Sequence, residues 1–96
     1  MSVLKDLQNW YESQCGKNWE AQFGVEIGTL DNPGWEVAID LADTGLEGKP
    51  FREIKELGDE RDWIRCWVEG KRFLGVGGPQ KLEEILRIFL GWAKEG

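Results

Sequence analysis

The sequence predicts an α+β fold, with a helix near each end of the chain and a five-stranded, mostly antiparallel sheet between them. Apolar residues recur every three or four positions near both ends and alternate with polar residues through the middle. Neither helix can bury its apolar stripe alone, so we expect both helices to pack on one face of the sheet. At 96 residues, the chain is expected to form one domain, residues 1–96, around one core.

The first predicted element is a helix over residues 2–15. Its apolar residues at helical spacing are Val3, Leu4, Leu7, Trp10 and Tyr11. Ser2 can cap the first turn, Asp6 suits the positive end of the helix dipole, and Gly16 can end the helix as a C′ glycine. Trp19 falls in the loop that follows, where the pattern leaves its role open.

A hairpin is predicted within residues 23–41. One face of it consists of Phe23, Val25, Ile27 and Thr29 on the first strand and Trp35, Val37, Ile39 and Leu41 on the second. Between the strands, Pro33 and Gly34 suit the second and third positions of a type II turn. Three acids, Glu26, Glu36 and Asp40, alternate with the apolar residues and should cluster on the other face.

Three further strands are predicted after a loop at residues 42–50, near residues 51–57, 62–69 and 72–76, with a turn at residues 58–61. In the middle one, Ile64, Cys66 and Val68 alternate with Trp63, Arg65 and Trp67, so the two sets lie on opposite faces. In the last strand we expect Leu74 and Val76 to face the core.

The final element is a helix that runs to about residue 94. Its apolar stripe consists of Leu82, Ile85, Leu86, Phe89 and Trp92. Pro79 is predicted at the first helical position, where its missing N–H has no cost. Gly77 and Gly78 precede it, but the segment lacks the Lys and the Ser or Thr of a phosphate-binding loop, so we interpret it as a plain turn.

The net charge of −6 is unevenly distributed. Residues 1–48 contain two basic and nine acidic residues, whereas residues 49–96 contain ten basic and nine acidic residues. No Lys or Arg occurs between Lys17 and Lys49. Such a surface repels nucleic acid and attracts a basic protein surface, although a merely solubilising surface would have the same composition.

The composition favours a binding protein over an enzyme. The chain has no histidine, so the common Ser-His-Asp, Cys-His and His-zinc sites cannot form. No spacing singles out a carboxylate pair, and Cys15 and Cys66 are expected to be reduced, buried and structural. We therefore expect no catalytic residues, cofactor or metal. No segment resembles a signal peptide or a membrane span, so we expect a cytoplasmic protein without membrane contact.

Trp63, Arg65 and Trp67 are the strongest candidates for a contact surface. Trp and Arg are enriched at binding hot spots, and these three share the face expected to point away from the helices. Alternatively, the two rings cover that face, with Arg65 stacked between them. Trp10, Trp35 and Trp92 lie on apolar stripes and are expected in the core.

Several segments resemble the immunity protein 53 family of bacterial polymorphic toxin systems. They are Trp10-Tyr11-x-Ser13-Gln14-Cys15, Trp19-Glu20, Gly24-Val25-x-Ile27, Thr29-Leu30-Asp31-Asn32-Pro33-Gly34-Trp35 and Gly77-Gly78-Pro79 with the helix that follows. The resemblance covers almost the whole chain. Ala21 stands where family members have a histidine, so no role of that histidine carries over.

The resemblance implies that residues 1–96 form a single immunity-type domain that binds and neutralises a cognate toxin domain and so protects the producing cell. Our hypothesis for the contact surface combines acids that attract a basic toxin, Glu26, Asp31, Glu36 and Asp40, with Trp63, Arg65 and Trp67 as anchors. We expect a monomer or a weak homodimer. The alternative is a non-enzymatic binding or scaffold domain that dimerises through its Trp-bearing sheet face.

Overall fold

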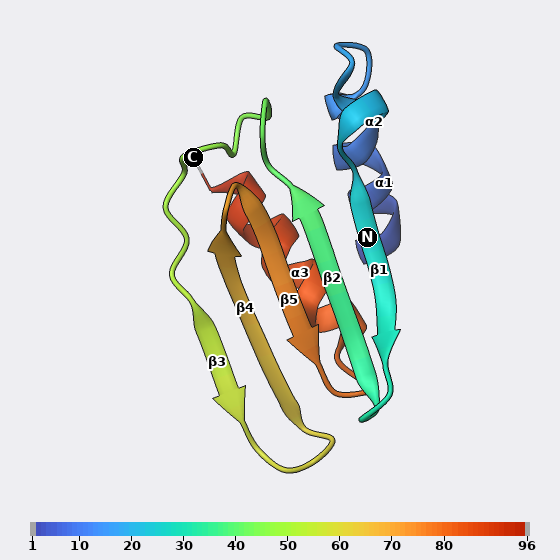
Figure 1. Ribbon diagram of the computed structural model, residues 1–96, viewed down its shortest axis with the longest axis vertical. Helices are drawn as coiled ribbons and strands as arrows, with labels where there is room; N and C mark the ends of the chain where they lie inside the picture. The colour runs from blue at the N-terminus through green and yellow to red at the C-terminus, as the bar shows by residue number, and fades with distance from the viewer. Residues whose placement is uncertain (1, 96) are drawn as a thin grey trace.

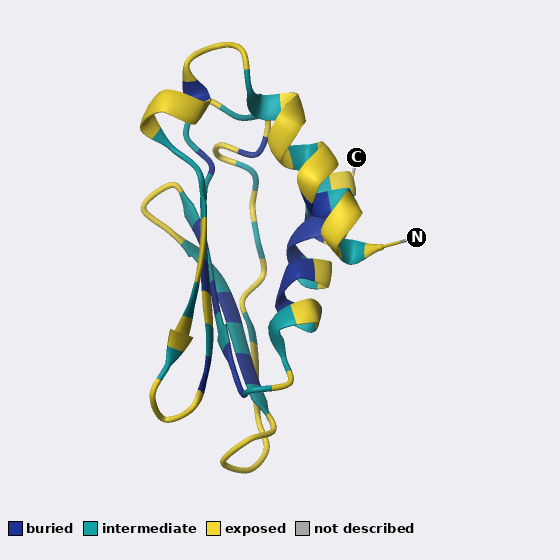
Figure 2. Cartoon of the chain, turned by 90° about the vertical axis from the view of Figure 1, so that its right-hand side faces the viewer, coloured by how far each residue is buried: buried dark blue, intermediate teal, exposed yellow. Residues whose placement is uncertain are grey.

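A computed structural model describes residues 2–95 and has the α+β architecture that the sequence predicts (Figure 1). The helices are α1 (Val3–Gln14), the short α2 (Trp19–Gln22) and α3 (Leu82–Lys94). The strands are β1 (Val25–Leu30), β2 (Gly34–Asp40), β3 (Ile54–Leu57), β4 (Trp63–Glu69) and β5 (Arg72–Gly77). Helices α1 and α3 lie on the same side of the sheet, whereas α2 lies beyond the start of β1, and no helix within residues 2–95 covers the other side (Figure 2).

The five strands form one sheet in the order β1-β2-β5-β4-β3, and every neighbouring pair is antiparallel. The two hairpins that join β3, β4 and β5 bring β5 against β2 in the centre. The edge strands are therefore β1 and β3, and β3 begins three residues later than predicted.

Helix α1 begins and ends where the sequence predicts. The Lys5 N–H donates to the Ser2 side chain at 3.2 Å, so Ser2 is the N-cap. Gly16 follows the C-cap residue Cys15 with φ +102°, a left-handed conformation that favours glycine. The sequence did not predict α2, a single turn in which Trp19 is buried and meets Trp10 edge-on at 5.8 Å. Trp19 is therefore a packing residue.

The β1–β2 turn differs from the predicted type II turn. The Asn32–Pro33 peptide bond is cis, and Gly34 has no positive φ but already pairs with Leu30 as the first residue of β2. Glycine is required there for space, since a Cβ at Gly34 would lie 2.3 Å from the carbonyl oxygen of Gly77 on β5.

The faces of β5 are the reverse of our prediction. Phe73 is completely buried on the helix side, whereas Leu74 and Val76 are half-buried on the other side. The two-residue turn Gly70-Lys71, in which both residues have φ near +60°, pairs Val68 with Phe73. Antiparallel partners share a face, so this register places Phe73 in the core.

The start of α3 also differs from the prediction. Pro79 lies in a turn three residues before the first helical residue, and its carbonyl accepts a hydrogen bond from the Trp35 indole at 3.0 Å. Trp35 is consequently half-buried at the margin of the core. The turn continues with the Lys81 N–H donating to the Gly78 carbonyl at 3.0 Å, and Lys81 is the N-cap residue.

The core lies between α3 and the sheet, and α1 packs mainly against α3. Its completely or nearly completely buried side chains are Ile39, Leu41, Ile64, Cys66, Phe73, Ile85 and Phe89. Trp92 is buried and Trp10 packs against this cluster, as predicted. Lys49 donates to the carbonyls of Trp92 and Glu95 at 2.7 and 2.6 Å and so satisfies the end of α3. None of the helices formed within residues 2–95 has the length and apolar character needed to cross a bilayer.

Candidate functional site

The candidate site is the sheet face turned away from α3, which we call the open face. Strand alternation and register assign its residues, because cross-strand partners point to the same side. It consists of Glu26 and Gly28 on β1; Glu36, Ala38 and Asp40 on β2; Arg72, Leu74 and Val76 on β5; Trp63, Arg65, Trp67 and Glu69 on β4; and Lys55 and Leu57 on β3. The open face thus brings together six of the seven predicted site residues. The seventh, Asp31, is exposed in the β1–β2 turn.

Arg65 and Trp67 form a packed pair on β4. The guanidinium carbon of Arg65 lies 4.0 Å from the centre of the Trp67 ring, within the range of a cation–π interaction. The Arg65 Nε also donates to Glu53 at 2.7 Å, and the Trp67 indole N–H donates to Glu69 at 3.0 Å. The predicted stacking of Arg65 is therefore present on Trp67, and ring and guanidinium are both oriented by carboxylates.

Trp63 begins β4 directly after a hydrogen-bonded loop. The backbone N–H groups of Arg61 and Asp62 each donate to the Asp59 carboxylate at 2.9 Å, which holds the pKa of Asp59 below its usual range. This loop places Trp63 on the open face opposite Leu57, and the ring is half-buried.

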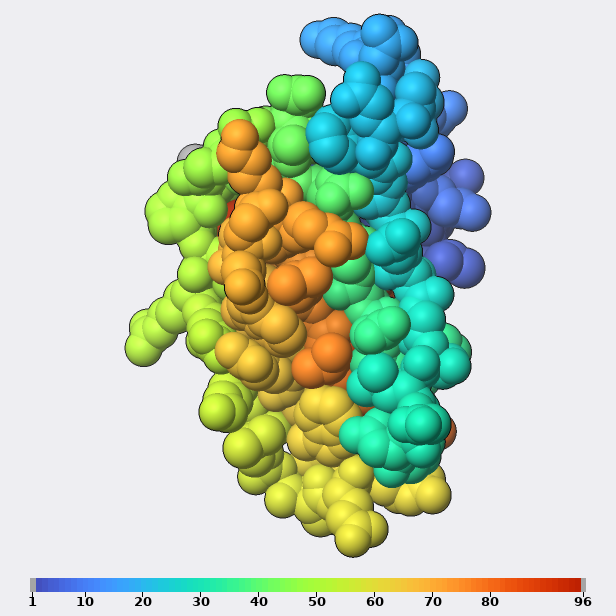
Figure 3. Space-filling model, in the orientation of Figure 1, coloured from blue at the N-terminus to red at the C-terminus, as the bar shows by residue number. Residues whose placement is uncertain are grey.

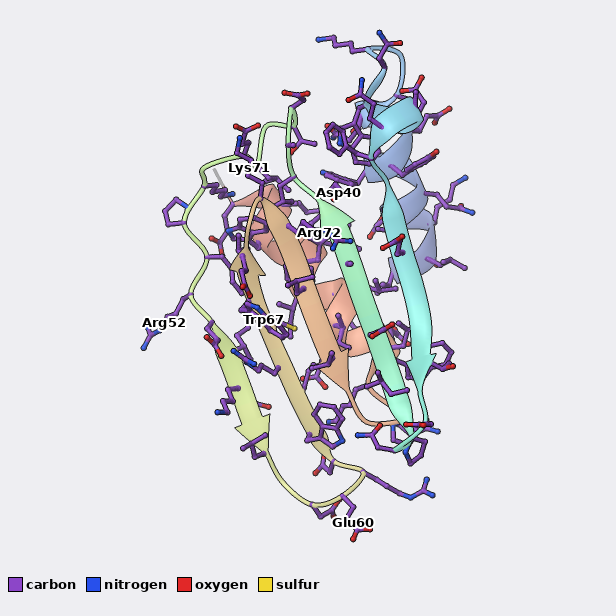
Figure 4. All side chains as sticks on the ribbon, in the orientation of Figure 1. Asp40, Arg52, Glu60, Trp67, Lys71 and Arg72 are labelled. Atoms are coloured by element: carbon purple, nitrogen blue, oxygen red, sulfur yellow. The ribbon has the colours of Figure 1, made fainter. Side chains whose placement is uncertain are left out.

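Arg72 occupies the upper part of the open face and pairs with two of the predicted acids (Figure 4). Its Nε lies 3.1 Å from Asp40 and its terminal nitrogen 3.0 Å from Glu26. The gap in basic residues between Lys17 and Lys49 therefore does not leave these acids without a basic neighbour, because Arg72 lies outside that segment in sequence and opposite Asp40 in the sheet. Asp40 also accepts from the Gly24 N–H at 2.9 Å, which ties the start of β1 to β2.

Glu36 differs from the other two acids. It is exposed in the middle of β2, beside Gly28 and Val76, and forms no salt bridge with any residue in the range 2–95. Its charge is therefore directed to solvent or to a partner.

Sequence reasoning missed Arg72, Leu74 and Val76 as residues of this face. All three follow from one register, and the signal was the spacing of the Gly70-Lys71 turn. A two-residue turn pairs Glu69 with Arg72 and hence Trp67 with Leu74 and Arg65 with Val76. Since Trp67 and Arg65 were placed on this face, their partners could have been placed there too.

The side chains of this face can form ion pairs, hydrogen bonds and apolar contacts with a partner. The chain has no histidine. Cys66 is completely buried on the opposite side of the sheet, and burial raises the pKa of its thiol to about 12, so the thiolate needed for a nucleophile does not form at neutral pH. Within residues 2–95, no three His, Cys, Asp or Glu side chains gather closely enough to hold a metal ion.

Fold and face together define a small α+β protein with one covered and one open sheet face, the open one bearing aromatic and charged groups. The family model of immunity protein 53 matches residues 4–94, nearly the whole chain, so this protein belongs to that family and has an immunity role. Immunity families are in general non-enzymatic and imply a toxin protein as partner. No curated protein and no solved structure matches the chain significantly.

Proposed function

We propose that this protein binds a cognate toxin domain through its open face and neutralises it inside the cell that produces the toxin. The chain would act as a single domain of residues 1–96 in the cytoplasm. The observation that carries this proposal is the open face itself, a sheet surface that no helix covers within residues 2–95. It presents Trp and Arg side chains, the types enriched where binding energy is concentrated.

The charge of the face supports a basic partner. Glu26, Glu36 and Asp40 outnumber Arg72 in its β1, β2 and β5 part, and Asp31 adds a further carboxylate at the end of the β1–β2 hairpin. Complementary charge accelerates association by steering the partner toward the surface. A toxin that acts on nucleic acid would be basic where it meets its substrate, so such a protein could be both attracted and covered by this face.

Dimerisation through the Trp-bearing face is the alternative, and the geometry favours a heterologous partner. Arg65 already covers one face of the Trp67 ring, and Trp63 and Trp67 are half-buried, which reduces the apolar area left for a second copy. Two copies facing each other would also juxtapose their acids. Size-exclusion chromatography with light scattering should give the monomer mass. A stable dimer that Trp63→Ala/Trp67→Ala dissociates would support the alternative.

The proposed function predicts that a gene for a toxin domain lies beside the gene of this protein, and that domain is the reagent for the test. Wild-type protein should restore growth of cells that express the toxin and should bind the purified domain. The folded double variant Trp63→Ala/Trp67→Ala should bind at least about 30-fold more weakly, the loss typical of hot-spot residues.

Leu4→Ala is the matched control, because Leu4 is an exposed apolar residue on α1, away from the open face. It should leave affinity unchanged. If the folded Trp double variant binds as tightly as the wild type, the two rings are not the anchors. The steering role is checked separately by the association rate, which should fall as salt is added; a rate independent of salt contradicts it.

A further inference from the structure

The open face contains a groove over β2, between β1 and β5, with a volume of about 820 Å³ (Figure 3). The groove exists because two small residues, Gly28 on β1 and Ala38 on β2, are diagonal neighbours across the paired strands. Leu74 and Val76 continue its floor on β5, and Trp67 on β4 forms one wall. The floor is therefore apolar and suited to the aliphatic stem of a long side chain.

The rim of the groove is acidic. Its charged lining residues are Glu26, Glu36 and Arg72, so carboxylates outnumber the guanidinium. The side chain of Glu26 is 78% exposed and contacts Arg72 with only one of its oxygens. Glu36 has no basic partner among residues 2–95, so its carboxylate is available to a cation from outside.

The open face already binds two guanidinium groups of its own chain. Arg72 lies between the carboxylates of Glu26 and Asp40, and Arg65 lies between the Trp67 ring and Glu53. In both cases an arginine from one strand is held by a carboxylate from a neighbouring segment. Around Glu36 the carboxylate and the apolar floor are present, and no arginine of residues 2–95 is paired there.

We propose that this groove receives an arginine side chain of the toxin domain, with its stem on Ala38, Leu74 and Val76 and its guanidinium on Glu36. The inference rests on the proposed function and adds the chemistry of the partner. Arginine fits better than lysine because its planar fork can bind a carboxylate with two hydrogen bonds and stack beside an aromatic wall. A second copy of this chain is disfavoured, because it would bring the same acidic rim.

A pair of short peptides tests the groove without the toxin. Acetyl-Gly-Arg-Gly-amide is titrated into the ¹⁵N-labelled protein, and the same peptide with citrulline serves as a neutral control of nearly equal shape. The arginine peptide should shift the amide signals of β1, β2 and β5 around Ala38 and the indole signal of Trp67. The citrulline peptide should bind at least about tenfold more weakly, because it lacks the charge-assisted bond.

Two variants locate the binding. Glu36→Gln keeps the shape of the groove and removes the charge of residue 36, so the affinity for the arginine peptide should fall at least about tenfold. Ala38→Phe fills the groove from the solvent side of β2 and should abolish the localised shifts. Glu56→Gln, an exposed acid on the edge strand β3, is the matched control and should change nothing. If Ala38→Phe does not fold, Glu36→Gln decides the test.

The proposal is overturned if arginine and citrulline peptides bind equally, if the shifts lie elsewhere, or if Glu36→Gln has no effect. Its failure is distinct from failure of the immunity proposal. If the arginine peptide binds but the protein does not protect cells against the toxin, the groove proposal stands and the immunity proposal fails. If both Glu36→Gln and Ala38→Phe still protect cells against the toxin, the immunity proposal stands and the groove proposal fails.

Discussion

From Trp63 to Trp67 on β4 and along the whole of β5, each residue of the covered face is more buried than its neighbours on the open face. Cys66 and Phe73 are completely buried against α3, whereas their neighbours Trp67 and Leu74 are half-buried on the open face. The covered face is apolar and closely packed by aromatic edge contacts, such as Phe73 with Phe89 at 5.2 Å. The open face is held by ion pairs between long side chains that remain partly exposed. We infer that the covered face supplies the stability and that the open face can carry binding residues at little cost to folding.

The largest expected effect is at Phe73. Phe73→Ala removes a completely buried ring and should lower the free energy of unfolding by about 3–5 kcal/mol. Leu74→Ala, on the neighbouring residue of the open face, should cost about 1 kcal/mol or less. Urea unfolding followed by tryptophan fluorescence measures both, and Phe73→Leu replaces Phe73→Ala if that variant does not fold. An equal or larger loss for Leu74→Ala would show that the two faces of β5 are not as described.

A smaller effect is expected at Gly75, which lies on the covered face of β5. A Cβ there would lie 2.5 Å from the Cγ2 atom of Ile85, so Gly75→Ala should destabilise by about 1–3 kcal/mol. Gly28→Ala is the matched change on the open face, where the nearest atom is the Glu36 carboxylate oxygen at 3.3 Å, the end of a mobile side chain. It should alter stability by less than about 0.5 kcal/mol.

Thermal unfolding of the two glycine variants provides the comparison. The packing explanation also predicts coupling, because Ile85→Ala removes the atom that a Cβ at Gly75 would meet. The double variant Gly75→Ala/Ile85→Ala should therefore lose less stability than the sum of the single changes. Strict additivity would contradict the contact as the cause.

The fold could be predicted where one pattern dominates. The period of α1, with Ser2 and Gly16 at its ends, has no competing interpretation, and neither has the alternation of Ile64, Cys66 and Val68 in β4. In β5 the face of Phe73 otherwise carries only Gly75 and Gly77, so hydrophobicity alone favoured Leu74 and Val76 for the core. The turn before β5 decides the question, because it fixes which residues pair.

The candidate site could be predicted in part for a related reason. Trp63, Arg65 and Trp67 belong to the well-defined strand β4, so their face followed from its alternation. The pairing of Arg72 with Asp40 and Glu26 joins residues separated by 32 and 46 positions. Such contacts depend on strand order. The pairing of β2 with β5 joins segments far apart in the sequence, so local sequence patterns do not predict it.

A small stability effect is also expected at Arg72, and it tests whether the open face is free to serve binding. Arg72→Gln removes the charge that bridges β1, β2 and β5, yet the side chains of Arg72 and Glu26 are 40% and 78% exposed. Solvent screens such pairs, so the loss should be only about 0.2–1 kcal/mol. It should shrink between about 0.1 M and about 1 M NaCl, where the Debye length falls from about 10 to about 3 Å.

Arg87→Gln is the control for Arg72→Gln, because Arg87 forms an exposed pair with Glu83 on α3, at 2.6 Å and outside the open face. Similar losses for the two variants would mean that the open-face network contributes no more to folding than an ordinary surface pair. A loss above about 2 kcal/mol for Arg72→Gln alone would show that the network holds the sheet together. If the two losses are similar, a substitution can change the charge of the groove by one unit without unfolding the protein. Arg72→Gln should then also bind a basic partner faster, because it leaves Glu26, Glu36 and Asp40 without their internal counter-charge.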